Sequence, residues 1–174
     1  MGVFINFAAF QAGWFACILG AAHHRPWLGP LVVTAVLALH LASSKAPAAE
    51  ALLAFSAGLV GFFVDSGLIA LGAYAPVRHL TPAPWSTLWL VFLWVNFATT
   101  LNVSLAWLRG RFALQLLLGA LGGPVAYYAG HGLKAIEMEE PLVVSLLSVA
   151  LAWSIATPLL FQLARQLARL SGRR

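Results

Sequence analysis

The sequence predicts an all-α fold, a polytopic transmembrane helix bundle of about six spans with both termini in the cytoplasm. The first observation behind this prediction is composition: 61% of the 174 residues are hydrophobic, 9% are charged, and the mean hydropathy is +0.89. An average soluble domain is about 25% charged, so this chain has too little charge to cover a surface in water. The second observation is that apolar residues form long continuous runs, whereas a membrane barrel strand would alternate at every second residue.

Six runs approach the roughly 20 apolar residues that a membrane helix needs. In chain order they are Phe4–Ala21, Trp27–Ser43, Ala51–Ala73, Trp85–Trp107, Phe112–Gly130 and Pro141–Ala164. The segments between them contain the prolines, glycines and charges that helix interiors avoid. Because lipid offers no water to bind backbone amides, we expect each run to be a helix. Gly122-Gly123-Pro124 predicts a local break in the fifth run.

The basic residues predict the orientation through the positive-inside rule. One side of the membrane would carry seven of the ten, namely Lys45, Arg109, Arg111, Arg165, Arg169, Arg173 and Arg174. The other side would carry Arg25, Arg78 and Lys134. We therefore expect both termini in the cytoplasm. We also expect residues 1–164 to form one transmembrane domain and residues 165–174 to form a basic cytoplasmic tail on anionic lipid.

Asp65 is the residue that is most costly to place in a membrane. An aspartate deep in a span costs roughly 2.5–3.5 kcal/mol on insertion scales, so it should face the bundle interior. The predicted intramembrane polar cluster consists of Asp65, Asn96, Gln11, Thr99, Thr100 and Asn102. One interpretation is a set of hydrogen bonds that hold the helices together. The other is a proton-titratable or substrate-binding site, and the residue types leave both interpretations open.

The second group of polar residues is predicted on the extracytoplasmic side. It consists of His23, His24, His79 and His131. Imidazoles near carboxylates can hold zinc, iron or copper. No HxxH or HxxxH spacing is present, so we predict no cofactor and keep a metal on this face as an alternative. His40, near the inner end of the second run, is expected to stand alone and to make a hydrogen bond at the interface.

Other functional classes lack their sequence signatures. There is no nucleophile elbow, HExxH, GxxxxGK[ST] or CxxC motif. The net charge of +5 comes from residues scattered at the ends of apolar runs, without a stripe that could follow a phosphate backbone, so we predict no nucleic-acid partner. The single cysteine, Cys17, cannot form an internal disulfide.

Glycines indicate where helices pack closely. They gather in the third and fifth runs as Gly58, Gly61, Gly67, Gly72, Gly119 and Gly123, the last two forming a GxxxG motif. Small residues let two membrane helices approach each other. Packing within one chain is the expected role, and a homodimer seam is the alternative.

Three stretches carry a resemblance to a known family. They are Phe10-Gln-Ala-Gly-Trp-Phe-Ala-Cys-Ile-Leu-Gly20, Phe97-Ala-Thr-Thr-Leu-Asn-Val-Ser-Leu-Ala-Trp107 and Gly119-Ala-Leu-Gly-Gly-Pro-Val-Ala-Tyr127. With them, and with Val64-Asp-Ser66, the chain resembles the domain-of-unknown-function 2878 family of small bacterial inner-membrane proteins. The resemblance covers nearly the whole chain and implies a Gram-negative inner membrane and about six helices. It implies no established activity. Members of that family are associated with the genes of fatty-acid-modifying enzymes, so the resemblance also hints that the ligand is a lipid.

For function, we expect an integral inner-membrane protein that binds or transports a lipid or small amphipathic molecule. In this hypothesis Asp65 is the protonation-sensitive group, and Gln11, Asn96 and Thr100 are its hydrogen-bonding partners. The alternatives are a membrane-embedded enzyme of lipid modification that uses the outer histidines, and a scaffold or accessory subunit. The lipid bilayer is the expected partner in each case.

Overall fold

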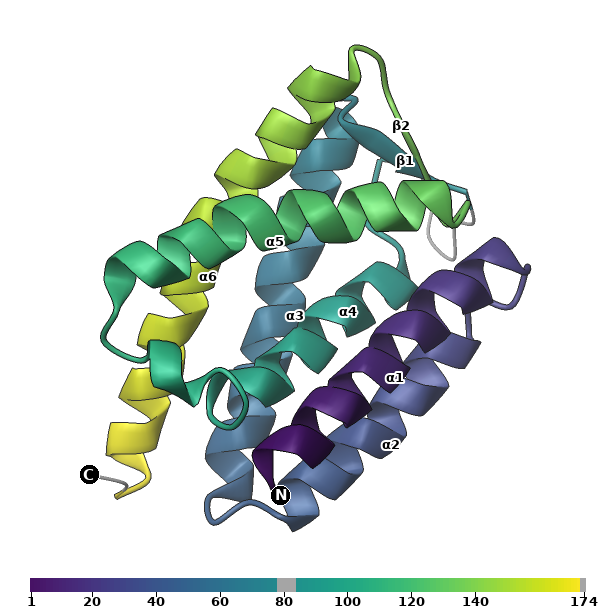
Figure 1. Cartoon of the computed structure of the whole chain (residues 1–174). Helices are drawn as coiled ribbons and strands as arrows, with labels where there is room; N and C mark the ends of the chain where they lie inside the picture. Colours follow the sequence, from purple (N-terminus) through teal and green to yellow (C-terminus); the bar gives the residue numbers. More distant parts are fainter. Residues whose placement is uncertain (78–83, 173–174) are drawn as a thin grey trace.

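The computed structural model describes residues 1–77 and 84–172, and that part of the chain contains six α-helices (Figure 1). They are α1 Val3–Ala22, α2 Leu28–Ala42, α3 Pro47–Ala70, α4 Leu88–Leu101, α5 Phe112–Gly132 and α6 Leu142–Leu170. A short 3₁₀-helix, η1 Ala106–Leu108, follows α4. Two strands, β1 Tyr74–Pro76 and β2 Ile136–Met138, pair antiparallel in segments that lie between the predicted spans. The predicted all-α architecture with six helices is confirmed.

Helices α1, α3, α5 and α6 are long and apolar enough to cross a membrane, whereas α2 and α4 have 15 and 14 residues. Large apolar side chains also cover the outside of the bundle. Phe4 is 89% exposed and Leu151 is 65% exposed. Contiguous apolar surface of this kind is unfavourable in water and favourable in hydrocarbon. The chain is therefore a multi-pass membrane protein.

Two predicted span limits and one predicted break were wrong. The predicted span Trp85–Trp107 is longer than α4, because the backbone is extended at Thr87 and turns after Leu101 into η1. The predicted span Ala51–Ala73 begins too late, because proline fits the first turn of a helix and α3 begins at Pro47. Helix α5 is continuous through Pro124, so the predicted break is absent.

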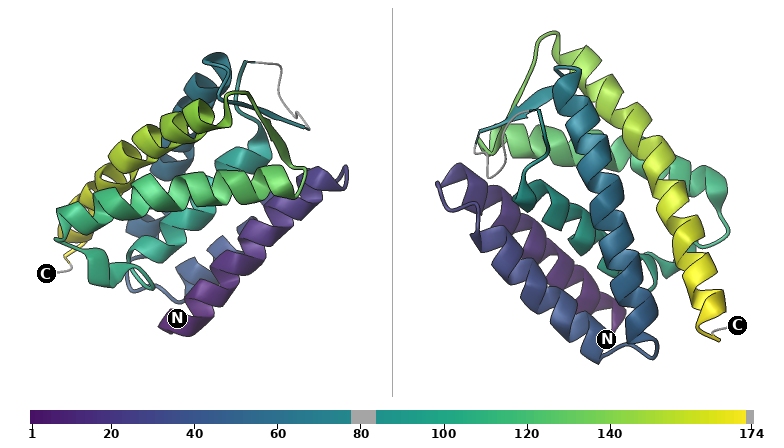
Figure 2. Two further views of the ribbon diagram at one scale, coloured as in Figure 1. Left: turned by 45° about the horizontal axis from the view of Figure 1, so that its top comes forward. Right: turned by 180° about the vertical axis from the view of Figure 1, so that it is seen from behind.

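Helix α4 is the central element of the bundle. It contacts α1, α2, α3 and α6. Views from the front and from behind place it between the pair α1/α2 and the pair α5/α6 (Figures 1 and 2). Because other helices surround α4, its 14 residues need not match the roughly 30 Å of hydrocarbon that a lipid-exposed helix crosses.

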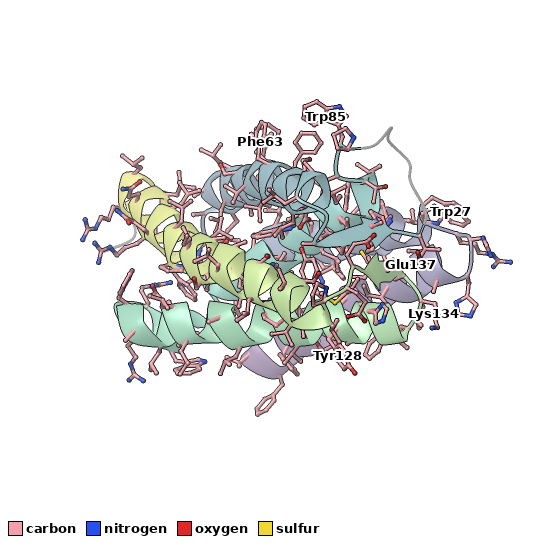
Figure 3. The ribbon with its side chains drawn as sticks, turned by 90° about the horizontal axis from the view of Figure 1, so that it is seen from above. Trp27, Phe63, Trp85, Tyr128, Lys134 and Glu137 are labelled. Atoms are coloured by element: carbon pink, nitrogen blue, oxygen red, sulfur yellow. The ribbon has the colours of Figure 1, made fainter. Side chains whose placement is uncertain are left out.

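The connections alternate between two ends of the bundle. Both termini, the α2–α3 turn and the α4–α5 connection lie at one end, and the segments that follow α1, α3 and α5 lie at the other (Figure 1). The two strands join the segments after α3 and α5, with Tyr74 opposite Met138. Trp27, Lys134 and Glu137 lie at this second end (Figure 3).

Glycines let bulky side chains approach the backbones of α3 and α5. A methyl group at Gly61 would lie 2.0 Å from the Trp94 ring, and one at Gly123 would lie 2.6 Å from the Trp153 ring. One at Gly119 would lie 2.1 Å from the Trp153 carbonyl oxygen. These glycines therefore pack against helices of the same chain, and the GxxxG motif lends no support to a homodimer seam.

Gly61→Ala should lower the free energy of unfolding by about 1–3 kcal/mol, because the added methyl group overpacks the contact with Trp94. Gly67→Ala in the same helix is the matched control, since nothing lies within 4 Å of a methyl group there. The control should be neutral or slightly stabilising, because alanine favours helix over glycine. Thermal unfolding in one detergent measures both variants. Equal melting temperatures for the two would contradict the close Gly61–Trp94 contact.

Candidate functional site

The Asp65 carboxyl group is fully buried and joins three helices. Its Oδ2 accepts a hydrogen bond from Trp94 Nε1 of α4 at 2.9 Å, and its Oδ1 accepts one from the Tyr127 hydroxyl of α5. Trp94 and Tyr127 are themselves buried. A buried carboxyl group without partners is very costly, so these two donors explain how α3 carries an acidic residue inside the bundle.

Tyr74 of β1 adds a third polar group near the carboxyl group. Its ring meets the Tyr127 ring edge-on, with 5.1 Å between centroids. The Tyr74 hydroxyl interacts with Asp65 and Tyr127 but makes no hydrogen bond of regular geometry. Burial, followed by the negative charge of Asp65, raises the pKa of the Tyr74 hydroxyl well above its usual range. Tyr74 therefore remains a neutral hydroxyl group at physiological pH.

Helix α6 contributes Trp153 and Thr157 to the same region. The Trp153 ring stacks on Trp94 at 4.1 Å between centroids. Its indole N–H is close to the Tyr127 hydroxyl, but neither it nor the buried Thr157 hydroxyl has a regular hydrogen-bond partner. We name this group of residues the Asp65 centre: Asp65, Tyr74, Trp94, Tyr127, Trp153 and Thr157.

A cavity of about 390 Å³ adjoins the Asp65 centre and lies among α1, α4, α5 and α6. Asp65, Tyr127, Trp153 and Thr157 all line it. Much of the remaining lining is aromatic: Phe7, Phe10, Trp14, Trp89, Trp94 and Phe97. No lysine, arginine or histidine is among the described lining residues. The cavity is thus apolar along its walls and carries a single carboxyl group.

The structure brings together some of the predicted cluster residues and separates others. Gln11 and Thr100 line the cavity with Asp65. Asn96 instead donates to the Phe10 carbonyl oxygen at 2.8 Å and packs against Gly13.

The hydroxyl groups of both predicted threonines bond within their own helix. Thr99 donates to the Asn96 carbonyl oxygen and Thr100 to the Phe97 carbonyl oxygen. These local bonds satisfy the hydroxyl groups without reaching Asp65. The expected partners of Asp65 are therefore replaced by Trp94 and Tyr127.

Asn102 belongs to a different polar group at the end that holds both termini. Its Nδ2 contacts both Glu50 carboxylate oxygens at 3.3 Å, and its Oδ1 accepts a bond from Arg109 at 2.8 Å. Glu50 also pairs with His40 through Nε2 at 3.2 Å, and both side chains are buried. The expectation that His40 stands alone was wrong, because Glu50 lies in the first turn of α3 and not in a loop. A polar cavity of about 100 Å³ adjoins this group.

Two of the predicted extracytoplasmic histidines, His23 and His131, make contacts with backbone groups. His23 Nδ1 lies 2.9 Å from the Leu19 carbonyl oxygen, and the Met138 N–H donates to His131 Nδ1 at 3.3 Å. His24 adopts a left-handed backbone conformation in the turn after α1. His79 lies outside the described residues. Within residues 1–77 and 84–172, no three His, Cys, Asp or Glu side chains lie close enough to hold a metal ion.

Sequence reasoning missed Trp94, Tyr127 and Trp153. Aromatic residues in apolar runs ordinarily form core, and so they attracted no functional interpretation. A signal was nevertheless present. Buried indole N–H and phenol O–H groups need acceptors, and Asp65 is an acceptor deep in a neighbouring span.

Asp65→Ala should destabilise the protein more than Asp65→Asn. Alanine leaves the Trp94 N–H and the Tyr127 hydroxyl without an acceptor, at about 1–3 kcal/mol for each group. Asparagine keeps an acceptor for Trp94 and gains an amide that donates to the Tyr127 oxygen. Melting temperatures in detergent compare the two variants, with Asn96→Ala as a polar deletion elsewhere on the α1–α4 contact. Equal losses for both Asp65 variants would contradict these bonds.

Comparison with known proteins places the chain in a family. No curated protein and no solved structure matches it. The family described as "Protein of unknown function (DUF2878)" matches residues 3–159, which is most of the sequence. The resemblance expected from the three sequence stretches is confirmed, and the chain belongs to this family of proteins of unknown function.

Proposed function

We propose that this protein binds a lipid or another small amphipathic molecule from the bilayer, in the cavity at the Asp65 centre. The observation that carries the proposal is the composition of the cavity. Aromatic and aliphatic side chains line most of it, and a few buried polar groups meet on α3, α5 and α6. Sites for small molecules typically combine apolar walls with a few placed polar groups.

The position of the cavity favours access from the lipid. Helix α1 packs on α2 and α4, whereas α5 packs mainly on α6, so α1 and α5 do not pack along each other. The cavity is lined from both sides of this gap, by Phe7 of α1 and Val125 of α5. These side chains are 53% and 68% exposed on the outside of the bundle. A hydrophobic molecule dissolved in the bilayer would enter sideways without crossing water.

The size of the cavity suits the same class of ligand. Its volume of about 390 Å³ falls within the roughly 300–1,000 Å³ of small-molecule sites. A molecule with an apolar chain would bury that chain against Phe10, Trp14 and Phe97, and its polar end would lie near the Asp65 carboxyl group. Longer molecules would leave part of the chain in the lipid between α1 and α5.

We further propose six membrane crossings, with both termini in the cytoplasm of a bacterial cell and residues 165–174 as a basic tail on the inner surface. The end of the bundle that holds both termini carries Lys45, Arg109, Arg111, Arg165 and Arg169 among the described residues, and the other end carries Arg25 and Lys134. Cytoplasmic segments are enriched in lysine and arginine.

Labelling of single cysteines tests this topology. In a Cys17→Ala background, Ser44→Cys and Gly110→Cys should react with a membrane-impermeant maleimide only after inverted vesicles are made. Gly132→Cys at the other end should react in intact spheroplasts. All three positions lie near exposed turns between helices. Reaction of Gly110→Cys and Gly132→Cys from the same side would contradict a crossing by α5.

Blocking the cavity tests the binding function. Gly122 lines the cavity, and the nearest atom to a methyl group there, Leu118 Cδ1, is 3.9 Å away, so Gly122→Leu should fold and fill the space. Gly67→Leu is the matched control, because its site is open and does not line the cavity. Native mass spectrometry of protein extracted gently from its own membrane should show a small amphipathic molecule retained by the wild type and by Gly67→Leu. Gly122→Leu should lose it. Equal retention by all three proteins would contradict the site.

A further inference from the structure

The side-chain amide of Gln11 is a polar group in the wall of the cavity that makes no bond within the described protein. Gln11 is only partly buried on α1, and it lines the cavity. Among residues 1–77 and 84–172, no group forms a hydrogen bond with its amide. Asp65 and Thr100, which also line the cavity, make their hydrogen bonds within the protein. Gln11 therefore differs from them in having both a free amide and accessible surface.

Gln11 stands in the middle of the face that α1 turns to the cavity. This face consists of Phe7, Phe10, Gln11, Trp14 and Ile18. Most of their spacings are three or four residues, which places them along one side of the helix. Apolar or aromatic side chains thus lie both above and below the amide, and a molecule that reaches Gln11 is surrounded by apolar surface on either side.

The depth of Gln11 separates its amide from the membrane surfaces. At 1.5 Å per residue, it lies about 12 Å along α1 from Val3 and about 16.5 Å from Ala22. Helix α1 is long and apolar enough to cross a membrane. Headgroups and bulk water at either end are then beyond the reach of a glutamine side chain. Because an amide without a partner is unfavourable in hydrocarbon, a molecule in the cavity is the natural source of that partner.

The chemistry of the amide specifies the group that fits it. A glutamine side chain donates through Nε2 and accepts through Oε1. A group that satisfies both atoms must itself donate and accept, as a hydroxyl or a primary amide does. An ester or an ether only accepts, so it would leave Oε1 without a donor. A hydrocarbon would leave both atoms unpaired.

We infer that Gln11 binds the polar group of the ligand, and that this group both donates and accepts hydrogen bonds. The inference rests on the proposed binding function. It narrows the ligand to a hydrophobic molecule whose hydroxyl or primary amide lies near the middle of the membrane. A phospholipid in its ordinary position does not fit, because its headgroup remains at the surface and its chains have no group for Gln11. A single-chain molecule that leaves the surface and enters between α1 and α5 does fit.

Three probes of one chain length test the inference. They are undecanamide, methyl undecanoate and undecane, each with a terminal bromine that quenches nearby tryptophan fluorescence. Four of the seven tryptophans, Trp14, Trp89, Trp94 and Trp153, line the cavity. Each probe is titrated into the full-length protein in nanodiscs of a single phosphatidylcholine. The measured quantity is the quenching that is present in the wild type and lost in Gly122→Leu.

Gln11→Leu should change the three affinities in different ways. Amide binding should weaken about tenfold, because the variant removes both the donor and the acceptor of the pair. Ester binding should weaken only about threefold, the loss of one neutral hydrogen bond. Binding of bromoundecane should remain equal or become tighter, since leucine offers it an apolar contact.

Gln162→Leu is the matched control for this variant. It makes the same side-chain change at an exposed position of α6 that does not line the cavity, so all three affinities should remain those of the wild type. Without a probe, Gln11→Leu should melt at the wild-type temperature or above it, because it removes an amide that the described protein does not bond. A lower melting temperature would show that Gln11 bonds within the protein and would overturn the inference.

The outcomes separate this inference from the function on which it rests. Equal amide affinities of Gln11→Leu and Gln162→Leu would overturn the role of Gln11 and leave the cavity as a binding site. Equal losses of amide and ester affinity in Gln11→Leu would overturn the requirement for a group that both donates and accepts. If no probe produced quenching that Gly122→Leu removes, both the inference and the proposed function would fail.

Discussion

The constraint on which this structure depends is the need to satisfy one carboxyl group in a place without water. Asp65 stands in the second half of α3, about four turns beyond Glu50, and its oxygens accept hydrogen bonds from two other helices, from Trp94 of α4 and Tyr127 of α5. Apolar side chains alone give membrane helices little reason to choose one neighbour over another, since lipid is equally apolar. A buried acid favours particular neighbours, because its oxygens accept bonds from both Trp94 and Tyr127 when α3, α4 and α5 pack in this arrangement. The acid therefore contributes to specificity of packing as well as carrying a cost.

The same constraint explains the glycines. A tryptophan can deliver its indole N–H to Asp65 only if its large ring lies between helices, and that requires a missing side chain opposite. Gly61 supplies the space for Trp94, and Gly123 supplies it for Trp153, which stacks on Trp94. Gly61 of α3 and Gly123 of α5 thus leave the space that the stacked rings of Trp94 and Trp153 occupy. A short α4 fits this scheme, because a helix enclosed by protein is fixed by its contacts and not by the thickness of the bilayer.

Much of the fold could be predicted from the sequence, and less of the site. Hydropathy shows which segments are apolar enough to lie in lipid, and this predicts the six helices. Because an acid inside such a segment must avoid lipid, hydropathy also predicts that Asp65 is buried. It does not report which face of a helix meets which neighbour, and depth alone made Asn96 look like the partner of Asp65. The sequence also stays apolar past the end of α4, because Val103, Leu105 and Ala106 follow, and so it does not reveal the turn at Asn102. The pairing of Glu50 with His40 was hidden for a similar reason: a glutamate beside prolines and alanines reads as a loop until the helix is known to begin at Pro47.

The two interpretations of Asp65, as a structural link and as part of a site, are compatible because its two oxygens offer about four acceptor positions and two of them are used within the protein. The bonds to Trp94 and Tyr127 use its oxygens to fix three helices, and that part is complete within the protein. The same carboxyl group also lines the cavity, together with Gln11 and Thr100. A carboxyl group that joins three helices and also lines an apolar cavity therefore supports both the packing of the bundle and the proposed binding of a molecule from the membrane.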